Sequence, residues 1–177
     1  MRTILDFDEI HKLGNDLAKR YDNVDILIDS IIPFLLFSYL AGAEAAGKML
    51  GAPALAENIG AAEMYMALFE KIDGKDFADR LRDGSDPSVV LETESHRLLN
   101  QGIMDAAKTS GLPDIKKIWV TMRDERVRDT HDYLEGMTVG LDERFFTFDG
   151  DSADAPGGFS KAENNVNCRC VLELSRE

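Results

Sequence analysis

Apolar residues recur at helical spacing through the first two thirds of the chain. The pattern predicts helices over five stretches, which are residues 4–19, 24–50, 53–71, 74–84 and 86–111. Pro53 stands in a first turn, where a helix tolerates proline, and Gly84 and Gly111 stand at helix ends. Residues 1–111 are therefore expected to form a helical region.

The pattern changes after Pro113 to short runs that are rich in β-branched and aromatic residues. It predicts one strand over residues 114–122, one or two strands over 137–150 and a last strand over 167–174. Trp119 lies within the first of these runs and is expected to belong to the core of this part.

A single short helix is predicted between the strands, over residues 124–136, capped by Asp124 and ended by Gly136. Residues 151–159 have the composition of a loop. The expected fold class is therefore α+β, with a helical region followed by a small mixed α/β module over residues 112–177.

The most apolar stretch of the chain is Ser30 to Ala43. Its fourteen residues carry no charge, but they fall short of the roughly 20 that span a bilayer, and Pro33 interrupts them. The N-terminus lacks the apolar segment of a signal peptide. We therefore expect a buried helix in a cytosolic protein that does not enter a membrane. The apolar residues from Ile26 to Leu40 exceed what one buried face needs, so part of them could instead contact a partner subunit.

The chain is strongly acidic, with a formal net charge of −13. A field of this sign repels phosphate backbones, and the densest basic runs, Lys116-Lys117 and Arg123 to Arg128, are not extended patches. General nucleic-acid binding is therefore not expected. The charge is compatible with a soluble protein that contacts other proteins.

The two cysteines of the chain, Cys168 and Cys170, are separated by one residue. On an extended strand both thiols point to the same face, and so short a loop resists a disulfide. If residues 124–136 are helical, Asp124, Arg128 and His131 share a face at i, i+4 and i+7. Two thiols, an imidazole and the Asp124 carboxylate would make an acceptable tetrahedral zinc site.

Two other interpretations of this cluster stay open. The same side chains could form a hydrogen-bonded structural network, or a Cys–His pair could act as a nucleophile, although no cysteine-hydrolase signature surrounds either thiol. Glu92, Glu94 and His96 are interpreted as a helix-surface group, with an acid–base or metal-binding role as the alternative. Asp149, Asp151 and Asp154 are interpreted as part of a solvated loop, with calcium binding as the alternative.

Several short motifs occur in a fixed order from about residue 92 to residue 174. They are "TESHRLLNQG", "KIWVTMRDERVRDTH", "LEGMTV" and "NNVNCRC", and the second contains W-x4-D-x3-R-x2-H. In this compound motif the segment resembles the phage Mu F-like, or phage head-morphogenesis, family of minor head proteins.

The resemblance implies a non-enzymatic role in head morphogenesis of a tailed phage or prophage, with portal and capsid proteins as partners. It implies a location in the virion or in the cytoplasm of the bacterial host. It also implies a metal, with zinc as the expected ion, bound by Asp124, His131, Cys168 and Cys170, and it implies that Arg128 contacts and orients these ligands. The rival functions are a metal-dependent hydrolase or transferase and a host-directed effector derived from a phage module.

Overall fold

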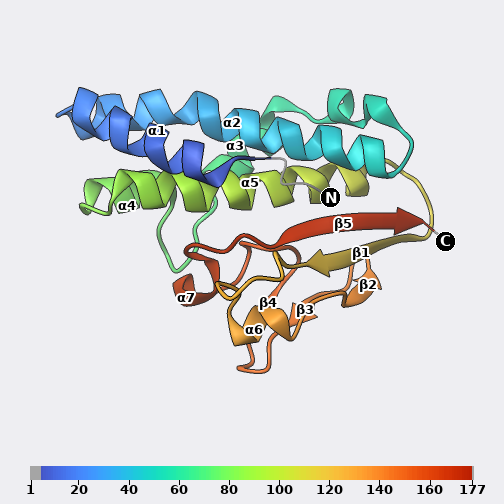
Figure 1. Ribbon diagram of the computed structural model, residues 1–177. Coiled ribbons are helices and arrows are strands. Elements are labelled where there is room, and N and C mark those ends of the chain that lie inside the picture. Colours follow the sequence, from blue (N-terminus) through green and yellow to red (C-terminus); the bar gives the residue numbers. More distant parts are fainter. Residues whose placement is uncertain (1–4, 177) are drawn as a thin grey trace.

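The computed structural model describes residues 5–176, and the chain has an α+β fold in which a layer of helices covers one side of a small C-terminal module (Figure 1). The helical part contains α1 (Phe7–Arg20), α2 (Val24–Met49), the 3₁₀ helix η1 (Pro53–Asn58), α3 (Ala61–Leu68), α4 (Phe77–Arg82) and α5 (Pro87–Thr109). Position 4, where the first helix was predicted to begin, lies outside the described residues.

Side-chain caps explain why the three longest helices, α1, α2 and α5, begin where they do. Asp6, Asn23 and Asp86 each accept hydrogen bonds from backbone N–H groups of the helix that follows. The predicted helix over 53–71 is wrong in one respect, because it is divided into η1 and α3 by extended backbone at Ile59 and Gly60. Glycine costs a helix about 1 kcal/mol relative to alanine, which favours a break at this position.

Helices α2 and α5 approach each other at the level of their backbones. A Cβ atom on Gly42 would lie 1.9 Å from the carbonyl oxygen of Leu99, and one on Gly102 would lie 2.0 Å from that of Tyr39. The Tyr39 hydroxyl donates a hydrogen bond of 2.6 Å to Asp105 at the same crossing. Only glycine permits this contact, so the pair of glycines sets the distance between the two longest helices.

The C-terminal module is built on a three-stranded antiparallel sheet in the order β2-β1-β5. Its elements are β1 (Ile115–Val120), α6 (Asp129–Asp132), β2 (Thr138–Gly140), β3 (Phe145–Phe146), β4 (Ser152–Ala153), α7 (Ala162–Asn165) and β5 (Val171–Arg176). Strands β3 and β4 pair separately. The 151–159 segment predicted as a loop therefore contains β4.

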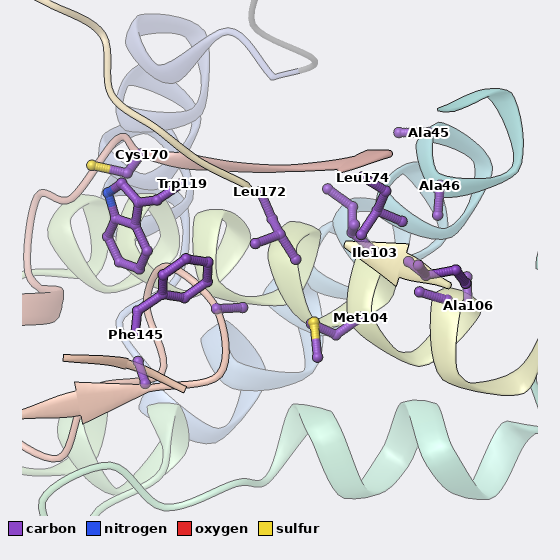
Figure 2. Packing of buried hydrophobic residues seen from close by; sticks show 14 of the residues in the cluster. Ala45, Ala46, Ile103, Met104, Ala106, Trp119, Phe145, Cys170, Leu172 and Leu174 are labelled. Carbon is purple, nitrogen blue, oxygen red and sulfur yellow. The ribbon is translucent and has the colours of Figure 1, made fainter. Parts of the chain in front are cut away.

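One core cluster joins the helices to the module. Ile103 and Met104 of α5 pack with Trp119 and Leu172 of the sheet and with Phe145, and Figure 2 shows these side chains gathered between the helix and the strands. Trp119 is fully buried, as predicted. The cluster thus contains residues from both sides of position 111. The division of the chain there stays a prediction.

Helix α2 is buried along one face and open along the other. Ile31, Leu35 and Tyr39 are completely buried, which confirms the predicted core role, whereas Phe37 on the outer face is 66% exposed. By length and composition alone, α2 could cross a membrane, and 44% of its most apolar 18-residue stretch is buried against the rest of the chain. The sequence prediction considered only the uncharged stretch of fourteen residues within this 26-residue helix.

Candidate metal centre

Three of the predicted ligands meet in the module. The Sγ atoms of Cys168 and Cys170 each lie 3.5 Å from Nδ1 of His131. All three ligand atoms lie within 4.8 Å of one another, and each residue is at most 3% exposed. Among the described residues, this is the group of histidine, cysteine and acidic side chains with the spacing of a metal site.

The cysteines lie in the segment that leads into β5, not inside the strand as predicted. Asn167, in a left-handed conformation with φ of 57°, turns the chain out of α7, and the Cys168 N–H donates to the Asn165 carbonyl. The predicted alternation is confirmed, because both thiols face His131 while the Arg169 side chain pairs with Asp124.

The predicted helix over 124–136 is wrong, since α6 spans only Asp129–Asp132. The Asp124 carboxylate accepts the N–H of Arg126, and its carbonyl accepts the N–H of Val127, which closes a turn. Arg128 is extended, with ψ of 149°. Aspartate competes with helix formation through such local hydrogen bonds. Asp124, Arg128 and His131 therefore do not share a helical face.

Asp124 stands apart from the three ligand atoms in the structure. Its carboxylate forms an ion pair of 2.7 Å with Arg169, and the hydrogen bond with Arg169 lowers its pKa. Arg128 is one of the residues that line the small cavity beside the thiols, and its guanidinium donates to the Val166 carbonyl. The role of Asp124 as a ligand and of Arg128 as a support both stay predictions.

Helix α5 holds the cysteine segment from the opposite side, which sequence analysis missed. The His96 ring hydrogen-bonds the Cys170 carbonyl through Nε2. Asn100, one turn later, donates to the same carbonyl at 3.2 Å and accepts the N–H of Leu172 at 2.8 Å. The i, i+4 spacing of His96 and Asn100 indicates that they share a helix face, but it does not indicate which residues they contact.

A hydrogen bond joins the two thiols and shifts their pKa values in opposite directions. Burial raises the pKa of Cys168, but the hydrogen bond with Cys170 and the nearby His96 and His131 rings outweigh it and hold this pKa well below its usual value. The hydrogen bond with Cys168 raises the pKa of Cys170, and burial raises it further. The hydrogen bond between the two sulfurs therefore favours ionisation of Cys168 over Cys170. A divalent metal binds both sulfurs as thiolates and displaces any proton that they hold.

The donor set fits zinc. With Zn–S of ~2.3 Å and Zn–N of ~2.05 Å, a tetrahedral site places sulfur and nitrogen about 3.6 Å apart. Both S···N distances here are 3.5 Å. A cavity of about 10 Å³ adjoins the cluster, which is close to the space that one water molecule needs. These residues could therefore supply three ligands and leave room for one small fourth ligand.

The predicted surface position of Glu92, Glu94 and His96 is wrong, because all three are buried. Glu94 forms ion pairs of 2.5 Å with Arg80 and 2.8 Å with Arg97. Burial raises the pKa of Glu94, but the two guanidinium groups outweigh it and the pKa is lowered. Helix α5 is covered on several sides, and an amphipathic pattern underestimates burial in such a helix.

The acidic loop is not simply solvated, because Asp151 is buried. Its carboxylate accepts hydrogen bonds from the backbone of Ser152, Ser160 and Lys161 and from the Asn164 amide. Burial raises its pKa, but these hydrogen bonds outweigh it and lower the pKa to about 2. Asp151 therefore fixes the turn between β4 and α7, which a sequence motif for calcium could not reveal.

Residues 55–173 match the family described as Phage Mu protein F like protein. The chain is 33% identical over 85 residues to the minor head protein GP7 of Bacillus phage SPP1, which is 48% of this chain and 28% of that protein. It is 39% identical over 85 residues to the NAD(+)–arginine ADP-ribosyltransferase EFV of Enterococcus faecalis, which is 46% of this chain and 17% of that protein.

The chain thus spans less than a third of the length of these curated relatives. No solved structure matches it. The family match begins after α1 and α2, extends over α3, α4 and α5 as well as most of the module, and includes His131, Cys168 and Cys170. The chain belongs to the phage Mu protein F-like family.

Proposed function

We propose that the chain is a minor head protein that acts in head morphogenesis of a tailed phage or prophage, and that zinc stabilises its C-terminal module. The family match and the likeness to a minor head protein support the first part. The two equal distances from the thiols to His131 support the second. Bound zinc would crosslink α6 to the segment before β5 and so close the long loop between them.

In this proposal His131, Cys168 and Cys170 supply three ligands. The fourth is a water molecule in the adjoining cavity or the Asp124 carboxylate, which must leave Arg169 to bind. Arg128 supports the site by holding the Val166 carbonyl and by stabilising the Cys170 thiolate with its charge.

Burial of the cluster favours a structural role over catalysis. A catalytic zinc keeps one position open to substrate. Here the ligands are almost wholly covered, and the adjoining cavity has the size of one water molecule. The transferase activity in the name of the Enterococcus faecalis relative belongs to a protein of which this chain covers 17%. We therefore propose no enzymatic activity for the chain.

The proposed location is the virion, with the host cytoplasm as the place of assembly and with portal and capsid proteins as partners. Deletion of the gene from an inducible phage or prophage should reduce the yield of normal heads, and mass spectrometry of purified virions should detect the chain. Normal yields and virions that lack the chain would contradict the head function whatever the metal content.

Elemental analysis of the purified chain tests the metal separately. Wild type and His11→Ala, which alters a partly exposed histidine, should hold about one zinc per chain, and His131→Ala should hold far less. Asp124→Ala shows whether Asp124 or water is the fourth ligand. The affinity for zinc should fall if Asp124 binds the metal and should stay unchanged if water does. Wild-type protein without zinc after purification in the absence of chelators would refute the metal centre.

A further inference from the structure

The outer face of α2 is apolar and open. Ile26, Phe34, Phe37 and Leu40 are 51%, 40%, 66% and 41% exposed, respectively. Ile26, Phe37 and Leu40 recur at spacings of eleven and three residues, so that they share one face of the helix. Figure 1 shows this helix along the outside of the helical layer, with α5 between it and much of the module.

Such a stripe is unusual in a strongly acidic chain. No charged residue occurs between Ser30 and Ala43, although the whole chain has a net charge of −13. Neighbouring apolar side chains that remain half exposed favour association, because covering them removes apolar area from water. The absence of charge also allows two copies of this face to meet without repulsion at the centre.

The charges at the two ends of the stripe show which occupant fits. Asp29 lies eight residues before Phe37, and Lys48 lies eight residues after Leu40. Both charged residues lie on the same helical face as Phe37 and Leu40. Pro33 lies midway between Asp29 and Phe37, and Glu44 lies midway between Leu40 and Lys48, so that every step along this face is three or four residues. Asp29 and Lys48 are exposed, and neither forms an ion pair within the part of the chain that the structure describes.

We propose that α2 packs against α2 of a second copy of the chain, antiparallel and about a twofold axis between Phe37 and Leu40. This arrangement puts Phe37 against Leu40 of the second copy and Asp29 against its Lys48, and both contacts occur twice. Glu44 falls opposite the uncharged Pro33. A parallel arrangement would instead place each charge opposite its own copy. The antiparallel pair matches apolar groups at the centre and opposite charges at both ends.

Sedimentation equilibrium of the full chain at micromolar concentrations tests the contact. Wild type should be dimeric, and Phe37→Glu should be monomeric with unchanged helix content because position 37 is exposed in the folded chain. Met66→Glu is the matched control: Met66 is 77% exposed on α3, outside the stripe, and its replacement should leave the dimer intact. A monomeric wild type would overturn the proposal. A monomer that binds phosphatidylcholine vesicles through this face would overturn it as well.

Charge reversal tests the orientation. Asp29→Lys and Lys48→Asp should each weaken the dimer by roughly tenfold, because each turns two attractive pairs into two repulsive ones. The double variant should restore the wild-type dissociation constant. Weakening without restoration would overturn the antiparallel arrangement. The zinc ligands lie in the module, so a monomeric Phe37→Glu that retains its zinc would separate this contact from the proposed metal centre.

Discussion

At the scale of single residues, His131 contacts both sulfur atoms through Nδ1, while its buried Nε2 has no hydrogen-bond partner among the described residues. Its ring is held by stacking on Phe159 and by an edge contact with Trp119. Aromatic packing and the contacts of Nδ1 with the two thiols therefore orient the ring, without a hydrogen bond to Nε2. Sequence spacing predicted that the thiols share a face, but it could not predict this orientation, which depends on aromatic residues far apart in the chain.

Replacing either cysteine should destabilise the module to a similar extent. Cys168→Ser and Cys170→Ser each remove one of three ligands, and loss of the zinc should lower the melting temperature of both variants by several degrees relative to wild type. Thermal unfolding followed by circular dichroism measures the effect. In protein stripped of zinc the variants should differ little from wild type. Variants as stable as the zinc-loaded wild type would contradict a structural metal.

Asp151 should make the module sensitive to acid. Its pKa is lowered to about 2, so the hydrogen bonds to its charged form stabilise the fold fully above the unfolded value near 3.9. This contribution of about 2 kcal/mol is lost as the pH falls from about 4 toward 2. Urea unfolding at pH 5 and pH 3 should show a smaller pH dependence for Asp151→Asn, which is already destabilised at pH 5. An identical pH dependence in both proteins would contradict this role.

At the scale of elements, the apolar periodicity predicted α1, α2, α4, α5 and β1 well, because each carries a long pattern or a clear cap. The extent of a helix was predicted wrongly where local hydrogen bonds compete with it, as at Asp124. The burial of side chains was predicted wrongly where a helix is covered on several sides, as in α5. The ligand spacing of the cysteines was visible in the sequence. Their attachment to α5 through His96 and Asn100 was not, because 70 or more residues separate the partners.

The α2–α5 crossing should be intolerant of any side chain. Gly42→Ala places a methyl group against the Leu99 carbonyl, a rigid backbone atom, so the helices must separate and stability should fall by about 3 kcal/mol. Gly60→Ala is the control, since its methyl group meets only the flexible Glu63 carboxylate, and its effect should stay below about 1 kcal/mol. Urea unfolding compares the two. Equal effects would show that the crossing is not closely packed in solution.

At the scale of the whole molecule, the metal centre and the helical layer are coupled through one core. Trp119 contacts His131 on one side and belongs to the cluster that includes Ile103 and Met104 of α5 on the other. Removal of zinc with a strong chelator should therefore destabilise the helices as well as the module. Trp119 fluorescence reports on the module, and circular dichroism at 222 nm reports mainly on the helices, so both should show one coincident transition at a lower temperature than in the zinc-loaded protein. Two separate transitions, with only the fluorescence shifted by the chelator, would instead show that the chain divides near residue 111 into independently folding parts.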